Sequence, residues 1–149
     1  MKKTIIALWH HPDMGKRSTL CELIDLVKRD KNYNKDKARN SAESEILTLG
    51  STIIGVDLQD EPHEKEFAAR LKVLVESCDI VFCTTPIPDD DPLVMAVNEY
   101  SEKGYQVIWT STYHVEPKEP QRKAEQEFFN ELKAHHLLNL VQTLIARDK

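Results

Sequence analysis

The chain has 149 residues, which is the length of one ordinary domain and too short for two well-cored ones. Apolar residues make up 40% of it and charged residues 30%, so it can bury a hydrophobic core. A formal net charge of −5 argues against a surface for nucleic acid or for an anionic membrane. No apolar run approaches the roughly 18 residues of a membrane-spanning helix. We therefore expect a single domain over residues 1–149, with neither a membrane nor a nucleic-acid partner.

The first apolar run, Thr4–Trp9, follows two lysines and imitates the start of a secretory signal. It ends at the polar segment His10–Asp13, and no small-residue cleavage site follows, so we interpret it as a first strand. The three cysteines form no CxxC pair and indicate buried free thiols in a reducing compartment; they are Cys21, Cys78 and Cys83. These features predict a cytoplasmic protein.

Periodicity predicts the elements of the first half of the chain. Apolar residues recur at i, i+3, i+4 and i+7 over Lys16–Arg29, which predicts a helix. The segment Asp30–Ala42 is polar throughout, so we expect a surface loop there. Two apolar runs, Glu45–Leu49 and Thr52–Val56, flank the turn residues Gly50-Ser51 and predict a β-hairpin.

In the second half, strands and helices alternate. A helix is expected to begin at Pro62. The run Asp79–Thr84 is apolar on both faces, which is typical of a buried parallel strand. Asp91 caps a helix whose first residue is Pro92. The remaining expected elements are the end of that helix at Lys103-Gly104, a strand over Tyr105–Thr110, a loop over Ser111–Pro120 and a last helix over Arg122–Arg147.

The last helix has a broad apolar face. We expect its core positions to be Phe128, Leu132, Leu140, Val141, Leu144 and Ile145. The doublets Phe128-Phe129 and Leu137-Leu138 widen this face, which indicates either deep burial against a sheet or a contact with a second copy. Because helices separate most strands, the sequence predicts an α/β fold. We expect a three-layer sandwich with a mostly parallel sheet of about five strands, including one hairpin.

Ligands of such a fold bind beyond the carboxyl ends of the strands. The loops expected at that edge are dense in polar and turn residues, and they are His10–Gly15, Asp57–Pro62, Thr84–Asp91 and Ser111–Pro117. That density favours a site, although strand-to-helix loops are polar in any protein. Neither the adjacent histidine pairs nor the cysteines have the spacing of a zinc site.

The first of these loops resembles a phosphate-binding loop, whose pattern is G-x-x-x-x-G-K-[ST] between a strand and a helix. Gly15 and Lys16 occupy the required places. A glycine lets backbone N–H groups approach phosphate oxygens, the helix N-terminus adds partial positive charge, and the lysine reaches the outer phosphates.

Two of the four defining positions depart from the pattern. His10 stands where the first glycine belongs and can supply a positive or hydrogen-bonding group instead. Arg17 stands where a hydroxyl normally binds Mg²⁺, and Ser18 and Thr19 follow one position late. An arginine cannot bind the cation, so Ser18 or Thr19 is the expected substitute and Arg17 becomes an extra cation for phosphate.

Four segments together resemble small bacterial proteins of the P-loop NTPase-like kind: Met14–Leu20, Ile54–Pro62, Cys78–Cys83 and Gly104–Ser111. The resemblance extends over nearly the whole chain and implies binding of a nucleotide, ATP or GTP, at Gly15, Lys16, Ser18 and Thr19. It implies no particular reaction. Members usually carry an intact Gly-Lys-[Ser/Thr] loop, so Arg17 puts Mg²⁺-dependent hydrolysis in doubt.

A magnesium nucleotide also needs an acidic residue. Asp57 ends an apolar strand as the metal-binding aspartate of such proteins does, and it is the candidate for holding Mg²⁺ through water. The simpler interpretation makes Asp57 a turn residue and Asp60 a helix cap. In the run Asp89-Asp90-Asp91, two carboxylates remain beside the cap as a weaker candidate for a cation.

Three functions therefore remain open, and the catalytic residues stay unassigned. The first is a nucleotide-binding protein with weak or no hydrolysis. The second is a non-catalytic regulatory module that has lost a nucleotide site and acts through a protein partner. The third is an enzyme similar to nucleoside deoxyribosyltransferases, which requires a carboxylate nucleophile that no single residue of this sequence supplies clearly.

Overall fold

The computed structural model describes residues 1–10, 15–41, 43–59, 64–86, 91–116 and 122–148. These residues form four α-helices, a short 3-10 helix and six strands. In chain order the elements are β1 Thr4–Trp9, α1 Lys16–Lys28, η1 Lys35–Lys37, β2 Arg39–Asn40, β3 Ser44–Leu49, β4 Thr52–Asp57, α2 Glu64–Ser77, β5 Ile80–Thr85, α3 Pro92–Glu102, β6 Gln106–Ser111 and α4 Arg122–Arg147. The expected α/β class is confirmed.

The six strands form one sheet in the order β2-β3-β4-β5-β1-β6. The pairs β4–β5, β5–β1 and β1–β6 run parallel. Strand β3 pairs antiparallel with both β2 and β4. The expected hairpin is confirmed as β3 and β4. The sheet is nevertheless mixed, so the prediction of a mostly parallel sheet of about five strands was wrong.

The additional strand lies in the segment that was expected to be a loop. Within residues 30–41, η1 is followed by β2, whose Arg39 faces Ile46 of β3 and whose Asn40 faces Glu45. Both β2 residues are exposed. A strand at the edge of a sheet pairs through its backbone and need not bury its side chains. Two polar residues can therefore form such a strand without the apolar pattern from which a strand is predicted.

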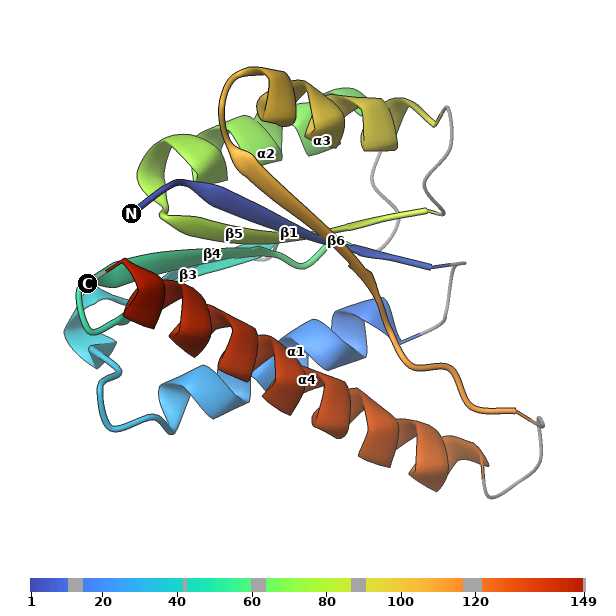
Figure 1. The fold of residues 1–149 in the computed structure, drawn as a ribbon. Coiled ribbons are helices and arrows are strands. Elements are labelled where there is room, and N and C mark those ends of the chain that lie inside the picture. The colour runs from blue at the N-terminus through green and yellow to red at the C-terminus, as the bar shows by residue number, and fades with distance from the viewer. Residues whose placement is uncertain (11–14, 42, 60–63, 87–90, 117–121, 149) are drawn as a thin grey trace.

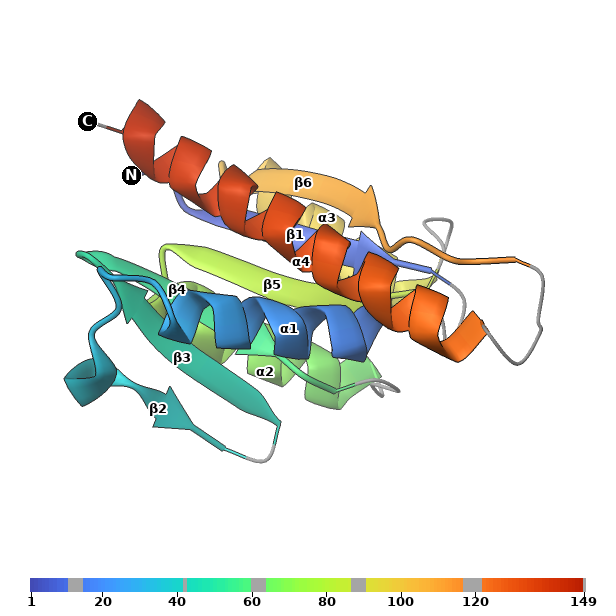
Figure 2. The same ribbon diagram turned by 90° about the horizontal axis from the view of Figure 1, so that it is seen from below.

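The helices cover both faces of the sheet and make three layers (Figure 1). Helices α1 and α4 pack on one face around Leu20, Leu23 and Leu137, while α2 and α3 pack on the other around Phe67 and Leu71. Figure 2 shows the sheet beneath α1 and α4, with β2 at one edge and β6 at the other. Strand β5 is buried along its whole length, as its apolar sequence predicted.

The buried face of α4 agrees only in part with the expected one. Of the predicted core positions, Val141 is buried and Leu140, Leu144 and Ile145 pack partly buried against the same core, whereas Phe128 is 58% exposed. The positions that are buried follow the spacing i, i+4, i+7 and i+11, and they are Asn130, Ala134, Leu137 and Val141. When apolar residues lie on several sides of a helix, their pattern does not show which side packs against the sheet. In α4 the side that packs there includes Asn130.

The cysteines are free thiols, as expected, but they are not all buried. Cys78 and Cys83 lie in the core beneath α2 and α3, and Cys21 is exposed on α1. Burial raises the pKa of the Cys78 and Cys83 thiols. Thiols with raised pKa are poor nucleophiles, so neither buried cysteine has the setting of a catalytic residue.

Candidate functional site

The topology places a switch point at the carboxyl edge of the sheet. The helices that follow β4 and β5 lie on one face, and those that follow β1 and β6 lie on the other. Neighbouring strands β5 and β1 therefore send the chain to opposite faces (Figure 1). Open α/β sheets bind ligands at such a point, beyond the ends of the two strands.

Lys16 is the side chain that occupies this point. Its Nζ donates hydrogen bonds to the carbonyl oxygens of His10, which directly follows β1, and of Thr85, which ends β5, both at 3.0 Å. The residue is only 8% exposed. The backbone N–H of His10 also donates to the Thr85 carbonyl, at 3.3 Å. The lysine predicted for phosphate binding is thus held between the two strands by neutral carbonyl groups.

Gly15 caps the helix that carries Lys16. Its φ of 81° and ψ of 12° place it in the left-handed region, and no side chain caps the helix at this residue. The first turn of α1 holds no acidic side chain. In the part of the chain that the structure describes, the N–H groups of Arg17 and Ser18 find no acceptor. A helix end with bare N–H groups and no negative charge attracts anions.

Asn130 of α4 lies against this turn, a contact that was not predicted. A Cβ atom added to Gly15 would stand 2.6 Å from Asn130 Oδ1, so only glycine leaves room for the amide. Asn130 Oδ1 accepts a hydrogen bond from Gln126 Nε2 at 2.8 Å, and Gln126 also donates to the Tyr113 carbonyl at 2.7 Å. Gln126 Oε1 accepts from the Val115 N–H at 3.0 Å.

The amides of Gln126 and Asn130 connect helix α4 with the chain after β6 through hydrogen bonds and with the Gly15 turn through a close contact. Sequence analysis missed both residues. The available signal was a pair of amides, Gln126 and Asn130, at spacing i, i+4 on a helix, which places them on one face. Polar side chains on the buried face of a helix must find hydrogen-bond partners, so they point to a contact beyond packing.

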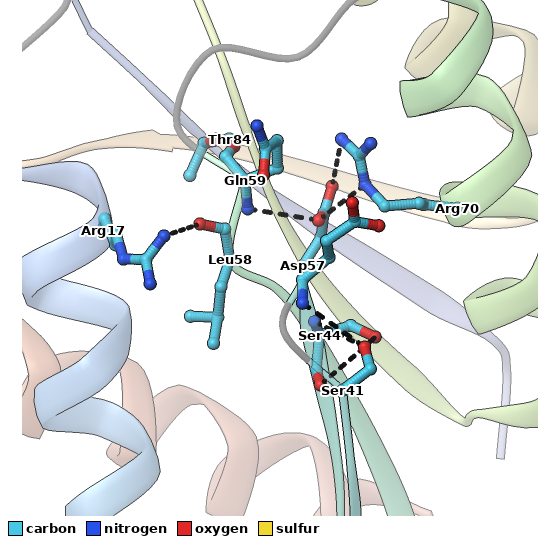
Figure 3. Close-up of polar contacts among 9 residues, drawn as sticks. Arg17, Ser41, Ser44, Asp57, Leu58, Gln59, Arg70 and Thr84 are labelled. Atoms are coloured by element: carbon cyan, nitrogen blue, oxygen red, sulfur yellow. Dashed lines mark hydrogen bonds and ion pairs between the residues drawn. The ribbon is translucent and has the colours of Figure 1, made fainter.

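The other predicted residues of α1 point in three directions. Arg17 Nη1 donates to the Leu58 carbonyl at 3.0 Å, so its guanidinium reaches the end of β4 (Figure 3). Ser18 is exposed and lines an open groove of about 330 Å³ between α1 and α4, together with Asn130. Thr19 is fully buried, and its Oγ1 has no hydrogen-bond partner. Ser18 and Thr19 therefore do not point the same way as potential cation ligands.

Asp57 ends β4, which β5 separates from β1. The carboxylate is 1% exposed, and both of its oxygens meet Arg70, with Nε at 3.0 Å from Oδ1 and Nη2 at 3.4 Å from Oδ2. The Gln59 N–H also donates to Oδ1, at 3.3 Å (Figure 3). Burial raises the pKa of Asp57, although the hydrogen bond and charge of Arg70 act in the opposite direction. A role in holding Mg²⁺ stays a prediction, and it would compete with this ion pair.

His10 lies beside two other aromatic rings. Its ring centroid lies 6.1 Å from that of Trp9 and 5.8 Å from that of His114. His114 follows β6 and contacts Glu116, with 2.8 Å between Nε2 and Oε1. The structure thus brings His10 close to Lys16, with His114 beside His10 and Asn130 against Gly15.

Several predicted positions lie outside the described residues: the loop interior 11–14, Asp60 with Glu61 and Pro62, and Asp89 with Asp90. Among the residues that are described, no group of three or more His, Cys, Asp or Glu side chains is placed to hold a metal ion. The described helices also include none with the length and apolar composition needed to cross a bilayer.

Comparison with known proteins found no matching family model, no matching curated protein and no matching solved structure.

Proposed function

We propose that the protein binds a nucleotide, ATP or GTP, through its phosphate groups at Gly15 and Lys16. The observation that carries this proposal is the place of the Lys16 ammonium, between the carbonyl ends of β1 and β5 at the switch point of the sheet. This ammonium lies in the first turn of α1, where a cation and the partial positive charge of the helix end both favour a phosphate.

The surroundings of the lysine support an anion rather than a cation or an apolar ligand. The first turn of α1 carries no acidic side chain, and the N–H groups of Arg17 and Ser18 find no acceptor among the described residues. Lysine acts on phosphate as a compact point charge and needs no fixed geometry. The rings of His10 and His114 lie beside each other beyond the ends of β1 and β6.

We propose further that hydrolysis is slow or absent. Arg17 occupies the position of the Mg²⁺-binding hydroxyl and donates to the Leu58 carbonyl instead. The candidate acid Asp57 is engaged by Arg70 and stands two strands away from β1. The same observations favour the second candidate, a non-catalytic module that acts through a protein partner. A cytoplasmic location belongs to the proposal, because the thiols are free and reducing conditions keep them so.

Calorimetric titration and thermal shift with ATP, GTP, their diphosphates and the free nucleosides test the proposal, each with and without Mg²⁺. Because the phosphates carry the affinity, the triphosphates bind most tightly and the nucleosides do not bind. A nucleotide at 100 times its Kd raises the free energy of unfolding by about 2.7 kcal/mol. No stabilisation by any nucleotide rejects the proposal and leaves the non-catalytic module.

Two variants locate the site. Lys16→Met removes the ammonium and abolishes binding, whereas Lys65→Met, at an exposed lysine of α2, leaves it unchanged. Ser18→Glu places a carboxylate in the bare first turn of α1, where it favours the helix but repels phosphate. We expect the Ser18→Glu protein to be at least as stable as the wild type but to bind the nucleotide more weakly. That result would show that the substitution affects binding and not folding. Ser51→Glu, in the exposed β3–β4 turn, is the charge-matched control.

A further inference from the structure

Strand β6 leaves one edge of the sheet open. Within the described residues it pairs with β1 only, and it ends the strand order (Figure 2). All six of its residues are half-buried, whereas every residue of the central strand β5 is buried. The side chains of β6 are therefore covered by helices on the two faces, but its outer side is not covered by another strand.

The backbone groups on that outer side can be assigned. The N–H of Gln106 donates to the Lys3 carbonyl at 2.9 Å, so Gln106 faces the β1 side. In a strand the N–H and C=O groups of successive residues point to opposite sides. Val107, Trp109 and Ser111 therefore direct their N–H and C=O groups outward, in a row that a further strand could pair.

The two edges of the sheet differ in their protection. Proteins blunt exposed edges with short strands, charged residues or proline. Strand β2 has two residues and carries Arg39. Strand β6 has the sequence QVIWTS, six residues without a charge or a proline. The edge at β6 thus has the properties of a pairing edge.

Apolar side chains flank this edge. Trp109 Nε1 donates to Asn98 Oδ1 of α3 at 3.2 Å, which places Asn98 over the edge strand. Met95 lies three residues before Asn98, on the same side of the helix, and it is 56% exposed. A strand that pairs with β6 would cover Met95 together with the half-exposed Trp109.

We infer that the occupant is a second copy of this chain, whose β6 pairs antiparallel with the first about a two-fold axis near Trp109. An isologous contact brings each residue of one copy against its symmetry mate, so a charged strand would meet its own charges. The uncharged β6 avoids that repulsion. About this axis Val107 of each copy faces Ser111 of the other, and the sheet continues across both copies.

Light scattering and hydrogen exchange on the full chain test this inference. The mass rises with concentration from 17.2 kDa to twice that value. In the dimer, exchange of the amides of Val107, Trp109 and Ser111 slows by an order of magnitude or more, while those of Ile108 and Thr110, already bonded to β1, exchange slowly at every concentration. A monomer at all concentrations, or a dimer in which the three outward amides stay fast, overturns the inference.

Variants of Val107 give an independent test. Val107→Pro removes an N–H that the single chain does not use, and it gives a folded monomer, whereas Val107→Thr keeps both the β-branch and the amide and stays dimeric. Val107→Lys, which keeps the backbone, also weakens the dimer if the proline variant fails to fold. A Val107→Lys protein that dimerises like the wild type contradicts the assignment of the interface to β6.

Discussion

The ammonium of Lys16 lies 3.0 Å from the carbonyl oxygen of Thr85, a residue 69 positions away in the sequence. This bond joins the first turn of α1 to the end of β5, the strand that neighbours β1. Because Lys16 also donates to the carbonyl of His10, one side chain holds the ends of β1 and β5 together. The residue proposed to bind phosphate therefore also stabilises the ends of these two strands.

The first prediction concerns this double role. Lys16→Met keeps the apolar stem but removes the ammonium from two carbonyl groups, so we expect the free energy of unfolding to fall by about 1–3 kcal/mol. Urea denaturation of both proteins measures the change. Lys65→Met, at an exposed position, stays within about 0.5 kcal/mol of the wild type. Equal stability of the two variants would contradict a structural role for Lys16.

The second prediction concerns Gly15. Gly15→Ala places a side chain in the left-handed region, which costs about 1–2 kcal/mol, and it brings the new Cβ into Asn130 Oδ1. Gly50→Ala has the same sign of φ, but its Cβ meets nothing within 4 Å, so it carries only the conformational cost. We expect the Gly15 variant to be the less stable of the two in thermal denaturation.

A double-mutant cycle isolates the contact with Asn130. In an Asn130→Ala background the obstacle is gone, so Gly15→Ala loses less stability there than in the wild type. Strictly additive effects of the two substitutions would show that the turn and α4 do not interact.

The third prediction concerns the ion pair between Asp57 and Arg70. Arg70→Met leaves a buried carboxylate without its cation, and we expect a loss of about 3–5 kcal/mol in urea denaturation. Removing both charges in Asp57→Leu with Arg70→Met restores much of that loss, because apolar replacements of a buried pair are often near neutral. Lys72→Met, at an exposed position of the same helix, is the control. A double variant as unstable as Arg70→Met would argue against the charge explanation.

The fourth prediction concerns pH. Burial raises the pKa of Asp57 above its ordinary value of 3.8. At pH values between the unfolded and the folded pKa, the folded protein therefore holds a proton that the unfolded chain has released. The stability contributed by this proton is fully present below the unfolded pKa and is lost as pH rises through the folded pKa. Relative to Asp57→Asn, the wild type becomes more stable as pH is lowered through this window. Urea denaturation at several pH values measures the difference, and the opposite slope would mean that Arg70 outweighs desolvation.

The fifth prediction concerns the start of α3. The Asp91 carboxylate accepts the N–H of Leu93 at 2.8 Å, which confirms the cap predicted from Asp91-Pro92. Asp91→Ala is expected to lower the free energy of unfolding by about 1 kcal/mol, whereas Asp91→Asn retains most of the cap. Thermal denaturation ranks the three proteins. A tie between the alanine and asparagine variants would show that the cap contributes little.

Local chemistry explains the elements that could be predicted. The helix that starts at Pro92 follows from a cap and a proline, and the hairpin around Gly50-Ser51 follows from turn residues between apolar runs. Strand β2 could not be predicted in this way, because Arg39 and Asn40 pair through their backbone alone. The buried side of α4 was equally hidden, since apolar residues occupy more than one side of that helix.

The candidate site also has a part that local sequence patterns predicted and a part that depends on contacts between distant segments. The sequence placed Gly15 and Lys16 at a strand-to-helix turn, because the motif and the helix start are both local patterns. It could not show that the Lys16 ammonium would lie between His10 and Thr85, since that depends on which strand becomes the neighbour of β1. Nor could it show that Arg70 meets Asp57.

By itself, the sequence determined the approximate bounds of α1, α3, α4 and most strands, since hydrogen bonding along the backbone, capping and side-chain periodicity act over a few residues. Only the tertiary structure decided the strand order, the open edge at β6 and the contact of Asn130 with Gly15. Those features come from how buried faces fit against one another across the whole chain, and such a fit leaves no short-range pattern in the order of amino acids.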